Sequence, residues 1–208
     1  MPRDLIRWSG AACIAGGLFI AAFVLVHPWD QLVGSAAART AQWRTAHTFH
    51  FIGALFALLG VVGIYAQVRD RVTTLGAVGF VVSFIGNALF LGTGMITAFI
   101  WPMLAMHAPA TVEQGGAIFS APVSAIAFLL TAVAMTIGYV MFGIALTRAR
   151  AFPFVAIVML VVGAILGMIP PHPVTPFPWA ALVLGGVLYG IAMIWIGSLL
   201  WRGKAVAP

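Results

Sequence analysis

The sequence predicts an all-α, polytopic integral membrane protein, with six transmembrane helices in one bundle and both termini in the cytoplasm. Three observations lead to this prediction. First, 63% of the 208 residues are hydrophobic and only 7% are charged, whereas a soluble domain has about 25% charged residues. Second, six apolar runs approach the roughly 20 residues that cross a bilayer. Third, the cations gather in alternate connections between these runs, as expected for loops that stay in the cytoplasm.

The six apolar runs cover residues 5–26, 48–67, 75–101, 121–147, 153–170 and 178–201. The first run follows a basic start, as in a signal peptide. It is nevertheless long enough to span the bilayer and is followed by no small-residue cleavage site, so we expect an uncleaved helix. No polar stretch between the runs is long enough to form a soluble domain. Residues 1–208 are therefore expected to form a single membrane domain.

The orientation follows from the distribution of Arg and Lys, because positively charged loops stay in the cytoplasm. Eight of the ten cations fall on one side of a six-span arrangement: Arg3, Arg7, Arg69, Arg71, Arg148, Arg150, Arg202 and Lys204. The outer side has only Arg39 and Arg44. This split predicts a protein of the cytoplasmic membrane. The net charge of +6 is explained by these loops, so we expect no nucleic-acid partner.

The first outer connection, residues 28–46, is predicted to be helical in its second half. Ser35 can cap a helix that runs without a breaker into the second span. Such a helix would place Arg39, Trp43, His47 and His50 on one face, at spacings of four, four and three residues.

Other features of the chain are expected to be structural. Thr111 and Gln114 fit a capping box for a short helix in the second outer connection. Tryptophans near the span ends predict aromatic belts at the membrane interfaces; they are Trp8, Trp29, Trp43, Trp101, Trp179 and Trp201. Pairs of small residues in the spans predict close helix packing: Gly60 and Gly63, Gly79 and Ser83, Gly163 and Gly167, and Gly186 and Gly190.

All five histidines are predicted to lie at the outer ends of the spans: His27, His47, His50, His107 and His172. Interfacial histidines can be simple amphipathic residues. Imidazole is also the commonest metal ligand, and helices of a bundle can supply several to one cofactor. His50 lies just inside the hydrocarbon, where an axial haem ligand is shielded from water. We therefore expect a b-type haem between His50 and either His27 or His107, with His47 one turn nearer the water.

The expected function is electron transfer by a membrane-embedded cofactor protein. Arg39 and Arg44 lie near the predicted site and would offer cations to the haem propionates. Copper is the second choice, because Met103, Met106 and His107 combine two thioethers with an imidazole, a set that suits Cu(I). The outer side carries few carboxylates, which argues against zinc.

Asn87 is the one amide near the middle of a span. In hydrocarbon its polar atoms need partners, and Ser83 lies one helical turn away. We expect an interhelical hydrogen bond; contact with a quinone head group or a transported solute is the alternative.

Two alternatives to a cofactor protein stay open. A small, glycine-rich bundle can be an accessory structural subunit of a larger membrane complex, or a homo-oligomer, with no cofactor of its own. A small-solute transporter is the other alternative, although such proteins usually carry ionisable residues within the membrane. The sequence has no GxSxG, HExxH or phosphate-loop motif that would name an enzyme.

Overall fold

The computed structural model describes residues 3–28, 34–113, 116–169 and 177–203. Every regular element within these residues is helical. Five helices are long and apolar enough to cross a membrane: Asp4–Val26, Ala41–Val68, Thr74–His107, Pro122–Arg148 and Trp179–Trp201. The prediction of an all-α polytopic membrane bundle is confirmed. The number of crossings and the side of the termini stay predictions.

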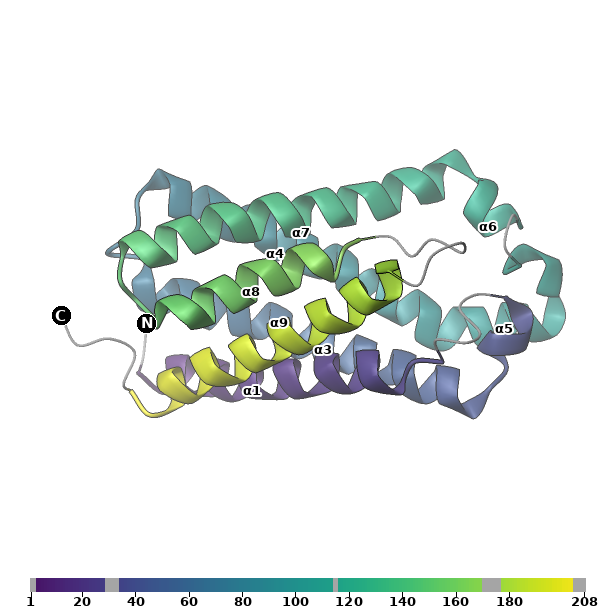
Figure 1. Cartoon of the computed structure of the whole chain (residues 1–208), viewed down its shortest axis with the longest axis horizontal. Coiled ribbons are helices and arrows are strands. Elements are labelled where there is room, and N and C mark those ends of the chain that lie inside the picture. The colour runs from purple at the N-terminus through teal and green to yellow at the C-terminus, as the bar shows by residue number, and fades with distance from the viewer. Residues whose placement is uncertain (1–2, 29–33, 114–115, 170–176, 204–208) are drawn as a thin grey trace.

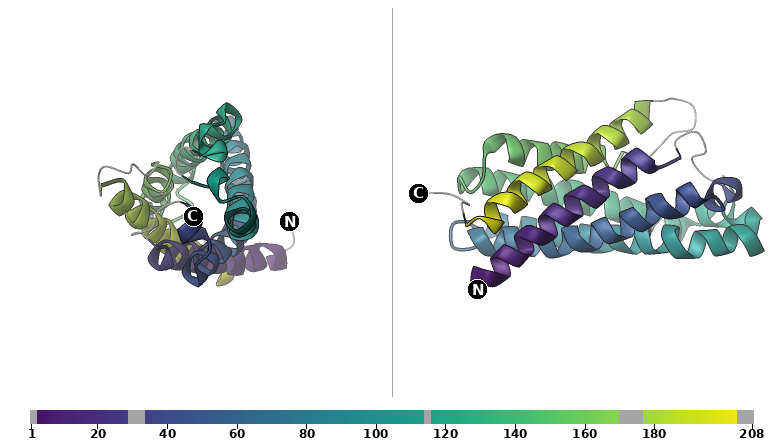
Figure 2. Two further views of the ribbon diagram at one scale, coloured as in Figure 1. Left: turned by 90° about the vertical axis from the view of Figure 1, so that its right-hand side faces the viewer. Right: turned by 90° about the horizontal axis from the view of Figure 1, so that it is seen from below.

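Six helices form a closed ring in the described part of the chain (Figures 1 and 2). They are α1 (Arg3–Val26), α3 (Ala41–Val68), α4 (Thr74–Met95), α7 (Pro122–Arg148), α8 (Phe154–Leu166) and α9 (Phe177–Trp201). Each packs against the next in this order, and α9 closes the ring on α1. The short helices α5 (Trp101–His107) and α6 (Ala117–Ser120) lie at one end. At the opposite end α1 begins and α9 ends (Figure 1).

Glycines let the helix backbones touch where the ring is tightest. Gly17 of α1 faces Gly190 of α9, and a Cβ added at Gly190 would lie 2.6 Å from the Gly17 carbonyl oxygen. Gly10 and Gly197 repeat this contact two turns away, with a Cβ at Gly10 placed 2.7 Å from the Gly197 oxygen. The predicted close packing through small residues is therefore present in the α1–α9 pair, which runs side by side in Figure 2.

The fifth apolar run forms a shorter helix than expected. Residues 153–170 were expected to span the bilayer, but α8 covers only Phe154–Leu166, 13 residues. This length gives about 20 Å of helix, against about 30 Å of hydrocarbon. Beyond the end of α8 the neighbouring helix α7 is poorly covered by the described residues, and Val123, Leu129 and Leu130 are exposed there.

The third apolar run forms a longer helix than expected. The span was expected to end at residue 101, but helical structure continues from Thr74 to His107, past Pro102. Residues Ile96–Ile100 form a π-helical turn immediately before α5. Proline has no N–H to donate to the preceding turn, and a widened turn accommodates this loss.

A helix does begin at Ser35, but the predicted unbroken run of this helix into the second span is wrong. A short helix α2 (Ser35–Ala38) ends before Thr40, which begins α3 by accepting a hydrogen bond from the Trp43 N–H at 3.0 Å. Arg39 therefore lies outside the helix that carries the histidines. The predicted capping box involves Gln114, which lies outside the described residues.

We expect the α7–α8 connection to be cytoplasmic and the connection after α5 to be external. The reason is the gathering of Arg69, Arg71, Arg148 and Arg150 in connections at the end of the bundle where α1 begins (Figure 1). Reporter fusions check this: a phosphatase fused after Arg150 should be inactive and one fused after Gly116 active. The reverse pattern would contradict the orientation.

Candidate cofactor cavity

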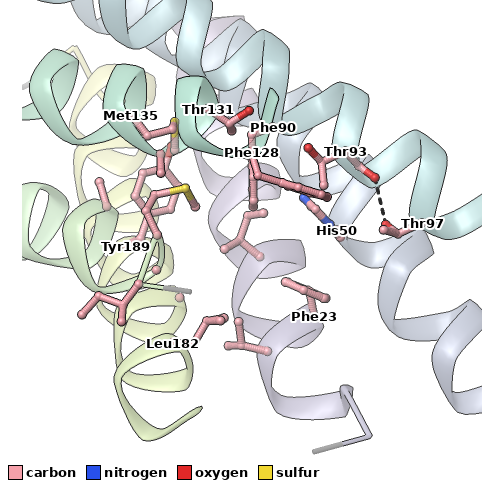
Figure 3. A pocket seen from close by; sticks show the side chains of 18 of the residues that line it. Phe23, His50, Phe90, Thr93, Thr97, Phe128, Thr131, Met135, Leu182 and Tyr189 are labelled. Carbon is pink, nitrogen blue, oxygen red and sulfur yellow. Dashed lines mark hydrogen bonds between the residues drawn. The ribbon is translucent and has the colours of Figure 1, made fainter. Parts of the chain in front are cut away.

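A large cavity of about 640 Å³ opens within the ring, lined by residues of α1, α3, α4, α7, α8 and α9 (Figure 3). Helix α4 and the helical residues that follow it line the cavity from Asn87 to Trp101. This corresponds to about 20 Å along a helix. Cavities that hold cofactors and other small molecules measure about 300–1,000 Å³ and are mainly apolar. This cavity has that size and no charged residue on its described wall.

The short α8 explains where the cavity lies. Gly163, Ala164, Gly167 and Met168, at the end of α8 and just beyond it, line the cavity. In the other half of the bundle the ring is filled by large buried side chains such as Phe142 and Leu160. The cavity therefore replaces core packing only on the side where the histidines lie.

Three histidines meet at the end of the cavity nearest Trp101, which we call the outer end because we expect it to face the exterior. The ring centroids of His27 and His47 are 5.1 Å apart, and those of His47 and His50 are 6.1 Å apart. Phe23 of α1 contacts all three rings. The outward position of the five histidines stays a prediction, and the structure brings three of them together from α3 and the end of α1.

His50 is held in a defined orientation at the cavity wall. Its ring stacks on Phe23 at 4.7 Å and contacts Phe90 of α4 at 4.1 Å, between centroids (Figure 3). Gly94 allows the ring to approach α4, since a Cβ there would lie 3.2 Å from His50 Cδ2. An imidazole fixed in this way is prepared to bind a ligand with little loss of side-chain freedom.

The ring nitrogens of His47 and His50 are buried and have no hydrogen-bond partner among the described residues. The backbone of Phe90 lies near the His50 ring, without the distance and angles of a hydrogen bond. A buried polar group without a partner costs about 1–3 kcal/mol. A bound molecule in the cavity would satisfy these nitrogens.

Two tryptophans close the outer end of the cavity. Trp43 and Trp101 stack with their centroids 5.5 Å apart, and Trp43 Nε1 donates to the Thr97 carbonyl at 3.0 Å. Both side chains are at least 96% buried. The prediction that these two belong to the aromatic belts is wrong, because their rings turn toward the cavity and away from the lipid. In the sequence, the four-residue spacing that puts Trp43 and His47 on one helix face was the sign that Trp43 belongs with the histidines.

Polar side chains of three helices meet at the inner end of the cavity. Asn87 Nδ2 donates to the Ser83 carbonyl at 2.7 Å and to the Tyr139 hydroxyl at 3.0 Å. The Tyr139 and Tyr189 hydroxyls lie 2.6 Å apart. Asn87 thus makes the expected interhelical hydrogen bond, while the Ser83 hydroxyl stays within its own helix by donating to Phe80. The two tyrosines were missed, although both lie in the middle of apolar spans.

The remaining predicted site residues lie apart from the cavity. Met103, Met106 and His107 are exposed on α5, and Arg39 and Arg44 are exposed near the start of α3. None of them lines the described cavity wall. His172 lies outside the described residues. His107 therefore does not oppose His50 in this arrangement.

A hydrogen-bonded contact ties the two outer connections together. The Ser35 N–H donates to Glu113 Oε1 at 3.1 Å, and Arg39 Nε donates to the Ser35 carbonyl at 3.1 Å. The side chain and the backbone N–H of Ser35 lower the pKa of Glu113, and Arg39 adds to this effect. The carboxylate therefore stays ionised and holds α2 beside the second outer connection.

Comparisons with known protein families, with curated proteins and with solved structures found no match.

Proposed function

We propose that the cavity binds a b-type haem, with His50 as an axial ligand, and that the protein transfers electrons within the membrane. The observation that carries the proposal is the pair of buried imidazoles, His47 and His50, whose nitrogens have no partner among the described residues and which line an apolar cavity. Coordination of iron would satisfy one of these nitrogens. A structural subunit without a cofactor gives no reason for placing them there.

The number of available ligands favours haem over a bare metal ion. Among the described residues, no three His, Cys, Asp or Glu side chains gather in a group that could hold an ion. Zinc and copper sites commonly need three or four such protein ligands. Haem needs only one or two, because the macrocycle supplies four nitrogens. A single well-held imidazole such as His50 is therefore enough.

A second residue that would hold the haem iron lies on or just after another helix of the ring. In the helix order α1, α3, α4, α7, α8, α9, helix α8 lies opposite α3. Met168 follows α8 and lines the cavity, as does Met135 of α7. A thioether opposite a histidine is a known haem ligation that raises the reduction potential. Both methionines are better placed than His107 for this role.

The cavity wall would control the redox behaviour. Its apolar residues, among them Phe23, Phe90 and Phe128 (Figure 3), exclude water from the cofactor. A low-dielectric environment disfavours the extra positive charge of ferric iron, so the reduced form is favoured. Arg39 precedes α3 and Arg44 lies in its first turn. A contact of either residue with haem propionates stays a prediction.

Haemin titration into cofactor-free protein tests the proposal. We expect one haem per chain and a saturable Soret band. His107→Ala, which changes an exposed histidine outside the cavity, should bind haem as the wild type does. Binding of Cu(I) in place of haem, lost in His107→Ala, would favour the copper alternative on α5. Haem binding without a defined stoichiometry would contradict a specific site.

A further inference from the structure

The inner end of the cavity has a different chemistry from the histidine end. Asn87 and Tyr189 line it, and Tyr139 lies behind them. We propose that this inner end binds the carbonyl head group of a lipid-soluble quinone, with the Tyr189 hydroxyl as hydrogen-bond donor. This inference goes beyond haem binding and stands without it, since it concerns other residues of the cavity.

The hydrogen-bond pattern leaves Tyr189 with a proton to offer. Both hydrogens of Asn87 Nδ2 are used, toward Ser83 and Tyr139. The Tyr139 oxygen already accepts from Asn87, and among the described residues its own hydrogen has only the Tyr189 oxygen, 2.6 Å away, as an acceptor. When Tyr139 donates to Tyr189, every hydrogen of the cluster has an acceptor, and the hydrogen of Tyr189 points away from Tyr139.

In this arrangement the acceptor that the described residues offer to that hydrogen is Asn87 Oδ1, at 3.5 Å. Hydrogen bonds between oxygen atoms are commonly about 2.7–2.8 Å long, so this contact is weak. A ligand oxygen in the cavity could take the hydrogen at a shorter distance. If the Tyr189 hydroxyl turned from Asn87 to the ligand, it would lose only this weak hydrogen bond.

The surroundings select a neutral, flat and apolar molecule. No charged residue lines the described cavity wall, so a fatty acid or a phospholipid head group would be buried without a counter-ion. Phe90, Phe128 and Met135 offer faces for a ring (Figure 3). A quinone combines such a ring with carbonyl acceptors and an apolar tail.

The quinone site and the histidine site are separated along the bundle. Asn87 marks the inner end, whereas His50 lies against Gly94 of the same helix. Seven residues of helix correspond to about 10 Å. A quinone ring at Tyr189 would therefore lie beside a haem held by His50, on the side of the haem nearer Asn87.

Calorimetric titration of the haem-free protein in nanodiscs tests the inference. The probes are a decyl-substituted benzoquinone and the matching decyl arene without carbonyl oxygens. We expect the wild type to bind one benzoquinone per chain, and Tyr189→Phe to bind it about tenfold more weakly, the loss of one good hydrogen bond. Tyr65→Phe is the control, because Tyr65 stacks on Phe80 at 4.2 Å and does not line the cavity.

The ratio of benzoquinone to arene affinity is the decisive value, because it does not depend on the folded fraction of a variant. Tyr189→Phe should lower this ratio about tenfold, and Tyr65→Phe should leave it unchanged. His50→Ala should abolish haem binding yet keep the ratio, so that failure of the haem proposal is seen separately. An arene that binds the wild type as tightly as the quinone, an unchanged ratio in Tyr189→Phe, or no binding of either probe would overturn the inference.

Discussion

Replacement of Gly17 by leucine is expected to prevent the bundle from folding. A Cβ at Gly17 would meet the carbonyl oxygen of Gly190, and backbone atoms cannot move aside as a flexible side chain can. The larger side chain would force α1 away from α9 and displace Phe23, which contacts the three histidines. Overpacking commonly costs about 1–3 kcal/mol, and a direct backbone contact makes the cost larger. Gel filtration of the detergent extract should give aggregate in place of a single peak.

The matched control is Gly92→Leu on α4. A Cβ at Gly92 meets nothing within 4 Å, so this variant should elute and melt as the wild type does. If the Gly17→Leu protein melts within a degree or two of the wild type, this result would contradict the close backbone contact between α1 and α9.

Replacement of His50 by leucine is expected to abolish haem binding and at the same time to stabilise the cofactor-free protein. Leucine removes two buried nitrogens that have no partner among the described residues and keeps an apolar contact with Phe23 and Phe90. Removal of an unsatisfied buried polar group restores about 1–3 kcal/mol. Residues kept for function commonly carry such a cost in stability. Thermal unfolding with and without haemin measures both effects.

His107→Leu serves as the comparison, because His107 is exposed and should leave both haem binding and stability nearly unchanged. A His50→Leu protein that still binds one haem with the same spectrum would remove His50 from the site. A His50→Leu protein less stable than the cofactor-free wild type would show that the imidazole contributes to packing.

The sequence predicts the fold class well because hydrophobic runs and cation placement act locally. It places helix ends less well where tertiary contacts decide them. The third span was expected to end at residue 101, but helical structure continues through the π-helical turn at Ile96–Ile100 to His107. A helix from Ser35 was expected to run unbroken into the second span, but α2 ends at Ala38 and the Ser35 N–H bonds to Glu113, 78 residues further along the chain. No local pattern shows such a partner.

The candidate site was predicted only in part, because it too depends on tertiary contacts between helices. The outward position of His27, His47 and His50 follows from the topology, so their grouping was partly foreseeable. Whether His107 joins them depends on which helices are neighbours, which the sequence does not contain. The Tyr139–Tyr189 pair joins helices 50 residues apart in the chain, and each tyrosine alone looks like an ordinary aromatic residue of a span.

The absorption spectrum of the wild-type protein, purified from cells supplied with haem precursors and iron, tests the central claim most directly. The account predicts a Soret band that shifts to longer wavelength on reduction with dithionite, sharp visible bands in the reduced form, and one iron per chain. A protein purified under these conditions with no absorption beyond its aromatic residues and no iron would contradict it.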